Sequence, residues 1–302
     1  MADLTEDFII QKCSVGNRDI LFFLTFNYEV ALQEVQNGQL FILKHEASWS
    51  YRDLSWTGIS LSSEDVPELI CFVLGRDGDV LVATKQGFHE EEIEYNGKNP
   101  LDFGPLQDIN IIGHSAFAVG MGRQVYKRVG RQKWISFEAG IQDPPDDSIV
   151  GFNSISGSDE DEMYAVGWGG EIWLYRENSW TQLDSPTNLI LNCVTISSNK
   201  DVFICGKSGV IIKGRFNSWN MVDYEGPVTD WITMTWFKEK LYLGDGYGLF
   251  SLDDTRLDEI IIPGEPKVPI NSLSSTEDLL VATGSDCAFS TRDGVNWIRL
   301  PV

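Results

Sequence analysis

A repeat with a period close to 40 residues constrains the fold of this chain more than any other feature. Each unit carries an apolar run that ends at a glycine, and four of these glycines are separated by 39, 38 and 40 residues: Gly167, Gly206, Gly244 and Gly284. Further short apolar runs follow each glycine, and most units then reach a tryptophan: Trp49, Trp134, Trp180, Trp219 and Trp297. A period of this length, with four short strands in each unit, is typical of a β-propeller blade.

Counting the units predicts an all-β fold, namely a single seven-bladed β-propeller domain of four-stranded antiparallel blades that spans residues 1–302. The predicted units are 19–54, 55–100, 101–143, 144–186, 187–226, 227–266 and 267–302. Residues 1–18 fall outside this count. Within them, Phe8 to Val15 is expected to be an extra N-terminal strand that closes the ring or covers an exposed edge.

The second and sixth units match the repeat least well. In the second, Leu69 to Leu74 and Val80 to Thr84 must be the central strands, and in the sixth the fourth strand is expected near residues 260–262. Asn37-Gly38 and Asp77-Gly78 have the turn preferences of tight hairpins between second and third strands. The tryptophans are expected to pack between blades.

The segment Ser290 to Trp297 resembles an Asp-box, the turn motif of sialidase-type (BNR) propellers, although Asp293 stands one residue too close to Trp297. The repeated Ala-Val-Gly runs with a downstream tryptophan also resemble the photosystem II assembly-factor propellers. Both resemblances imply a propeller fold. They imply no particular activity, because one fold hosts many unrelated functions.

The charge balance restricts the partners of this chain. It has 23 Lys and Arg against 45 Asp and Glu, a formal net charge of -22. Such a field repels phosphate backbones and anionic lipids, so no nucleic acid and no membrane is expected as a partner. Two interpretations of the acidity stay open: it serves solubility, or it steers a basic protein partner.

Cysteine usage and the first residues predict a location. The five cysteines are an odd number without a CxxC pair, and they lie in apolar runs, where a reduced cysteine behaves as a small hydrophobe. The opening residues carry no basic region, and the apolar run Phe8 to Ile10 is too short for a signal peptide. The sequence therefore predicts a cytoplasmic protein, expected to be a monomer.

Motifs for chemistry are missing from the sequence. Only three histidines exist, His45, His89 and His114, so no metal site built on histidine is expected. No nucleophile elbow and no phosphate-binding glycine loop followed by a helix is present. We therefore predict no catalytic residues, no metal ligands and no cofactor, and hence a protein that is not an enzyme.

Loops at one end of a propeller usually carry its function. Loops joining second to third strands share one face with the crossings between blades. This face is predicted to receive the partner-binding residues Trp168, Tyr247, Asp77, Arg123, Asp245, Asp286, Asp146 and Asp147, together with Lys207, Trp56, Tyr224 and Asp230. For Trp168 two roles stay open: an exposed anchor for a partner, or a plug of the central channel.

Three functions are compatible with these features. The leading hypothesis is a non-catalytic protein that binds a basic partner, most concretely an immunity protein that neutralises the toxin domain of a bacterial toxin. The alternative is an assembly or scaffold propeller. The third, a calcium-dependent or glycan-directed hydrolase, depends on carboxylates that are plentiful but lack the spacing of a calcium loop.

Overall fold

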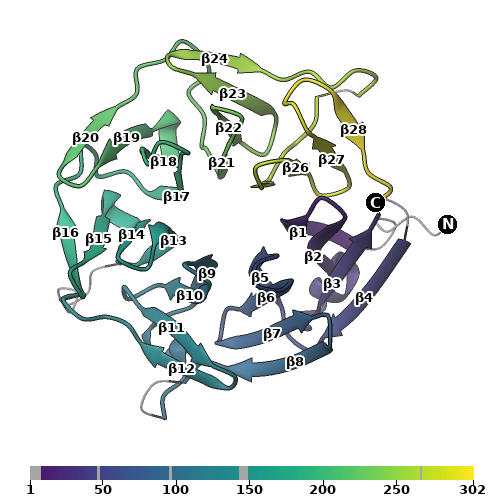
Figure 1. Cartoon of the computed structure of the whole chain (residues 1–302), viewed down its shortest axis with the longest axis vertical. Helices are drawn as coiled ribbons and strands as arrows, with labels where there is room; N and C mark the ends of the chain where they lie inside the picture. Colours follow the sequence, from purple (N-terminus) through teal and green to yellow (C-terminus); the bar gives the residue numbers. More distant parts are fainter. Residues whose placement is uncertain (1–7, 46–47, 95–96, 143–148, 266) are drawn as a thin grey trace.

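The computed structural model describes residues 8–45, 48–94, 97–142, 149–265 and 267–302. Seven four-stranded antiparallel sheets surround a central channel like the blades of a propeller (Figure 1). The predicted fold class is confirmed.

The first three blades follow one another along the chain. The first consists of β1 (Phe8–Asn17), β2 (Ile20–Asn27), β3 (Gly38–Lys44) and β4 (Ser48–Leu54), with helix α1 (Tyr28–Ala31) between β2 and β3. The second consists of β5 (Gly58–Glu64), β6 (Ile70–Gly75), β7 (Asp79–Thr84) and β8 (Gly87–Glu92). The 3₁₀ helix η1 (Pro100–Phe103) leads to the third, which consists of β9 (Leu106–Ile112), β10 (Ser115–Gly120), β11 (Val125–Gly130) and β12 (Lys133–Ser136).

The other four blades complete the ring. The fourth contains β13 (Phe152–Asp159), β14 (Glu162–Gly167), η2 (Trp168–Gly170), β15 (Ile172–Arg176) and β16 (Ser179–Leu183). The fifth contains β17 (Leu191–Ile196), β18 (Val202–Gly206), η3 (Lys207–Gly209), β19 (Ile211–Arg215) and β20 (Ser218–Met221). The sixth contains β21 (Thr233–Phe237), β22 (Lys240–Gly244), β23 (Leu249–Asp253) and β24 (Arg256–Glu259). The seventh contains β25 (Ser272–Ser275), β26 (Leu280–Thr283), β27 (Ala288–Thr291) and β28 (Trp297–Arg299).

The segment predicted as an extra N-terminal strand is β1, the innermost strand of the first blade. This blade therefore begins at Phe8 and not at residue 19. The ring closes through contacts between β1 and the seventh blade: the Cys13 amide donates to Ser272 Oγ at 3.1 Å, and the Val15 amide donates to Ser274 Oγ at 3.0 Å. An apolar cluster shared by the two blades covers the same seam.

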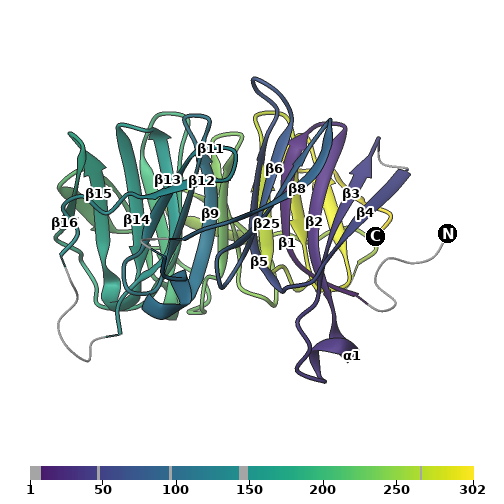
Figure 2. The ribbon, with the colours of Figure 1, turned by 90° about the horizontal axis from the view of Figure 1, so that it is seen from below.

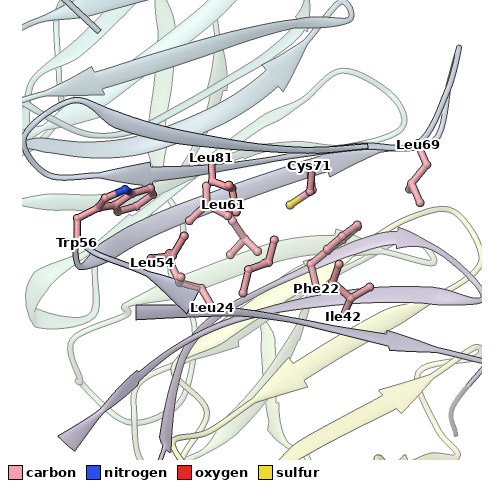
Figure 3. Close-up of a cluster of buried hydrophobic side chains, with 12 residues drawn as sticks. Phe22, Leu24, Ile42, Leu54, Trp56, Leu61, Leu69, Cys71 and Leu81 are labelled. Carbon is pink, nitrogen blue, oxygen red and sulfur yellow. The ribbon is translucent and has the colours of Figure 1, made fainter. Parts of the chain in front are cut away.

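Apolar side chains fill the spaces between neighbouring blades, because each blade is a sheet that packs against another blade on both of its faces. Figure 3 shows one such space, where Phe22 and Leu24 of the first blade meet Leu61 and Leu81 of the second. The outer tryptophans take part in this packing, as predicted. Trp180 of the fourth blade, for example, is 2% exposed and belongs to an apolar cluster with Phe117 and Val119 of the third.

The repeated glycines have a steric cause. A Cβ on Gly206 would lie 2.2 Å from the carbonyl oxygen of Ile190, and one on Gly167 would lie 1.9 Å from that of Gly151. In each case the chain that enters the innermost strand of the blade passes against the end of the second strand. A side chain at this position would push the backbone away.

We expect Gly206→Ala to lower the free energy of unfolding by about 1–3 kcal/mol, because backbone must move to admit the methyl group. Gly130→Ala is the matched control, since a Cβ there meets no atom within 4 Å. Equilibrium unfolding in urea measures both variants. Equal stability of the two would contradict the steric explanation.

Two local predictions are wrong, and two are confirmed. Asn37-Gly38 is not a two-residue hairpin, because β2 and β3 are joined by the ten residues 28–37. The fourth strand of the sixth blade is β24, which ends before residues 260–262; there Ile262 is buried, whereas Ile261 is exposed. The Asp77-Gly78 turn forms, with Gly78 at a φ of 110°. The central strands of the second blade, β6 and β7, also lie where predicted.

All five cysteines are free, and four of them are buried. Across the described ranges, no helix has both the length and the apolar character needed to cross a membrane.

Candidate partner-binding face

One face of the propeller is formed by loops between second and third strands and by the crossings between blades. We call it the crossover face and define it by residues 28–37, 55–57, 76–78, 93–94, 97–105, 121–124, 137–142, 149–151, 168–171, 184–190, 207–210, 222–232, 245–248, 260–265, 267–271 and 284–287. Helix α1 projects from this side, at the bottom of Figure 2.

Exposed apolar side chains gather on the crossover face. It carries ten of the exposed large hydrophobic residues of the described chain: Tyr28, Leu32, Val35, Leu101, Phe103, Ile149, Leu189, Val228, Tyr247 and Ile261. Among the described residues of the opposite face, whose loops join first to second and third to fourth strands, only Val66 and Val295 are of this kind. Exposed apolar side chains rimmed by polar ones mark interaction surfaces, so the asymmetry favours the crossover face.

The crossover face is also acidic. Its described ranges contain fourteen acidic residues and only five basic ones, which are Arg76, Lys98, Arg123, Lys207 and Lys267. Two of the five are neutralised at close range: Arg123 pairs with Glu171, and Lys207 Nζ lies 2.8 Å from Asp230 Oδ2. The hydrogen bond from Lys207, with a second from the Ser208 amide, lowers the pKa of Asp230 and keeps it ionised. The surface therefore presents a negative field.

Tyr247 is an exposed side chain on a fixed turn. The residue is 72% exposed, and it follows Gly246, whose φ is 82°. The carboxylate of Asp245 accepts hydrogen bonds from the amides of Tyr247 and Gly248, at 2.8 and 2.7 Å. Asp245 thus holds the loop that presents Tyr247, as aspartates commonly do in turns.

Trp168 is half-buried at the start of η2, where its amide donates to the carbonyl oxygen of Gly151 at 3.0 Å. The central channel is a cavity of about 260 Å³ lined by the innermost strands, and Trp168 is not among its lining residues. Trp168 therefore lies on the crossover face and outside the lining of this cavity. Whether it contacts a partner stays a prediction.

The predicted aspartates lie in different surroundings. Asp77 is half-buried beside Arg76, with 3.5 Å between Asp77 Oδ1 and Arg76 Nε, whereas Asp286 is exposed. Burial and the neighbouring Asp77 carboxylate together raise the pKa of Asp79. Asp146 and Asp147 lie outside the described residues.

Arg123 does not belong to the exposed surface, contrary to the sequence prediction. Only 7% of it is exposed, and its guanidinium forms a bidentate pair with Glu171, from Nε to Oε2 at 2.9 Å and from Nη2 to Oε1 at 2.5 Å. Its Nη1 also donates to the Gln142 carbonyl, and the group lies 5.3 Å from the ring centroid of Trp173. Arg123 joins the third blade to the fourth. Trp56, another predicted face residue, is likewise buried.

The α1 loop, residues 28–37, is absent from the sequence predictions, yet it places Tyr28, Leu32 and Val35 on the crossover face. The signal was present in the chain. Ten residues separate the apolar run of β2 from that of β3, whereas three or four separate the corresponding strands in the other blades.

The channel offers a different chemistry. Its wall carries Lys12, Asp108 and many hydroxyl and amide side chains. Burial raises the pKa of Asp108, whose carboxylate accepts hydrogen bonds from Ser60 Oγ at 2.7 Å and from the Ile155 amide at 3.1 Å. Among the described residues, no group of three or more histidine, cysteine or acidic side chains could hold a metal ion.

Comparison with solved structures supports the fold. YCF48 from Cyanidioschyzon merolae has a TM-score of 0.66 and 13% identity, with 94% of this chain and 95% of YCF48 covered. Virginiamycin B lyase from Staphylococcus aureus has a TM-score of 0.65 and 9% identity, with 81% and 84% covered. YCF48 supports the resemblance to photosystem II assembly-factor propellers at the level of fold, whereas the Asp-box resemblance stays a prediction.

Comparison of sequences shows the family. No protein-family model matches the chain. The Immune protein Tsi7 of Pseudomonas aeruginosa is 30% identical over 248 residues, which cover 82% of this chain and 81% of Tsi7. The similarity extends over about four-fifths of both chains. The chain belongs to the family of the immunity protein Tsi7.

Proposed function

We propose that this protein is a non-catalytic immunity protein that neutralises a toxin by binding it with the crossover face. The observation that carries the proposal is membership in the family of Tsi7, at 30% identity over about four-fifths of both chains. The concentration of exposed apolar side chains on the crossover face supports the choice of surface. Asp245 with Tyr247, Trp168, Asp77 and Asp286 are its proposed contact residues.

The proposed partner is a basic toxin domain. Acidic residues outnumber basic ones on the crossover face, and the whole chain has a net charge of -22. A complementary field speeds encounter and disfavours wrong partners. We propose that the protein acts as a monomer in the cytoplasm, and its five free thiols support a reducing compartment.

Co-expression tests the proposed function. Any toxin-like open reading frame found beside the gene for this protein is induced in a heterologous host, with and without this chain. We expect growth to be restored only in its presence, and the purified proteins to form a stable complex. Failure to protect against every neighbouring toxin-like product would overturn the proposal, and a stable complex without protection would favour a scaffold.

Electrostatic steering makes a separate prediction. The association rate constant with the toxin domain should fall about tenfold or more between 50 and 500 mM salt, because screening shortens the reach of the acidic face. Asp286→Lys should lower the rate constant about two- to fivefold at low salt. Asp278→Lys, at an exposed position on the opposite face, is the control. A rate indifferent to salt would mean that the acidity serves solubility alone.

A further inference from the structure

The α1 loop differs from every other connection of its kind in the described chain. It contains ten residues, 28–37, where the corresponding loops contain three or four. Figure 2 shows that it extends well beyond the rest of the crossover face. A feature that projects this far meets a partner before the remainder of the surface does.

The loop is held at its base by two asparagines. Asn27 caps α1 by accepting a hydrogen bond from the Val30 amide at 3.0 Å. Asn37 Oδ1 accepts from the Asn27 amide at 2.6 Å, its Nδ2 donates to the Val35 carbonyl at 3.1 Å, and its amide donates to Thr57 Oγ1 at 3.3 Å. These hydrogen bonds join the two ends of the loop to each other and to the crossing between the first and second blades. The loop therefore loses little conformational entropy when it binds a partner.

The tip of the loop carries apolar side chains that the described residues leave about half exposed or more. Tyr28 is 49% exposed, Leu32 is 61% exposed and Val35 is 52% exposed, and α1 has no buried residue. The only charged residues of the loop are Glu29 and Glu34. The loop is thus an apolar projection with a purely acidic rim.

We propose that the α1 loop inserts into an apolar recess of the toxin domain whose rim is basic, and that it is the main anchor of the complex. This inference rests on the proposed function. A projection cannot be buried against a flat surface without holding the rest of the crossover face away, so its complement must be concave. Glu29 and Glu34 select a rim of lysines and arginines, since like charges there would be repelled.

The same charges argue against other occupants. A second copy of this chain would bring one acidic loop and one acidic face against another, within two molecules that each carry -22. An anionic membrane surface would repel the loop for the same reason. A basic protein therefore fits the loop better than either alternative.

The test compares two faces of the same ring. The triple variant Tyr28→Ser, Leu32→Ser, Val35→Ser removes the projection's apolar tip, and Val66→Ser with Val295→Ser removes side chains that are 64% and 76% exposed on the opposite face. The ligand is the toxin domain that the wild-type protein neutralises on co-expression. We expect the triple variant to raise Kd about 100-fold or more, chiefly by faster dissociation, and the control to change it less than about twofold.

Circular dichroism should show both variants folded with wild-type melting temperatures, because none of the altered side chains is buried. A photo-crosslinking phenylalanine derivative at position 32 should react with the toxin domain, and one at position 66 should not. Wild-type affinity of the triple variant would overturn the inference while leaving the proposed function intact. Crosslinking of position 32 to a second copy of this chain would also overturn it. If the wild-type protein neutralises no toxin, both proposals fall together.

Discussion

Arg123→Ala is expected to lower the free energy of unfolding by about 3–5 kcal/mol, because it strands the carboxylate of Glu171 in the interior. Both side chains are under one-tenth exposed, and they form two hydrogen bonds across the seam between the third and fourth blades. The substitution also removes the donor to the Gln142 carbonyl. Equilibrium unfolding in guanidinium chloride at neutral pH measures the loss.

Arg76→Ala is the matched control for this experiment. Arg76 lies on the same face, but its side chain is 55% exposed and its nearest carboxylate oxygen, on Asp77, is 3.5 Å away. An exposed pair of this kind contributes at most about 1 kcal/mol. If Arg123→Ala left stability unchanged and instead weakened toxin binding, Arg123 would be a contact residue as the sequence suggested, and the seam would not depend on it.

Glu91→Ala should have an effect of similar size, about 3–5 kcal/mol, at the seam between the second and third blades. Glu91 is 4% exposed on β8, and Arg128 donates to both of its oxygens, at 2.9 and 2.8 Å. Trp134 Nε1 donates to Oε2 at 3.1 Å as well. The neighbouring Glu90, whose side chain is 51% exposed, provides the control variant Glu90→Ala. In both thermal and denaturant unfolding, Glu91→Ala should be clearly less stable than Glu90→Ala.

The same carboxyl predicts a dependence on pH. Burial opposes its ionisation, but the hydrogen bonds from Arg128 and its neighbours outweigh burial and lower the pKa of Glu91 to about 2. Since the unfolded value is about 4.3, Glu91 stabilises the fold above that pH, and the contribution is lost as pH falls towards 2. Glu91→Gln should therefore lose less stability than wild type between pH 5 and pH 2, as urea midpoints would show. Parallel curves for the two proteins would contradict this assignment.

The number of blades could be predicted because most blades need a glycine at a position where a side chain would not fit. A glycine at the end of a second strand is required where the entering chain passes within reach of a Cβ, so Gly167 and Gly206 repeat with the blades. The first blade was misjudged because innermost strands carry no such marker. In the first blade, β1 places Lys12 and Ser14 in the polar channel, and β2 ends at Asn27 where most other second strands end at a glycine.

The site was less accessible to prediction, because exposure depends on residues far apart in the sequence. Arg123 follows Gly122 in a turn and resembles a surface residue, yet its partner Glu171 lies 48 positions later. Asn37-Gly38 has the composition of a tight turn, but Asn37 fastens the base of a longer loop. Tyr247 could be placed on this face from sequence, since Asp245 and Gly246, which shape its turn, are its neighbours in the chain.

The way in which the ring closes bears on how the protein is made. Leu21, Phe23 and Phe41 of the first blade are covered by Leu279, Val281, Ala288 and Leu300, which lie in or beside the seventh. During translation the first blade is synthesised before the seventh. Its apolar flank therefore stays exposed until the seventh blade has been made and has folded against it. A chain that stops before the seventh blade would keep this flank exposed and would be a substrate for chaperones and proteases. The proposed protection against a toxin would then require chains that include the seventh blade.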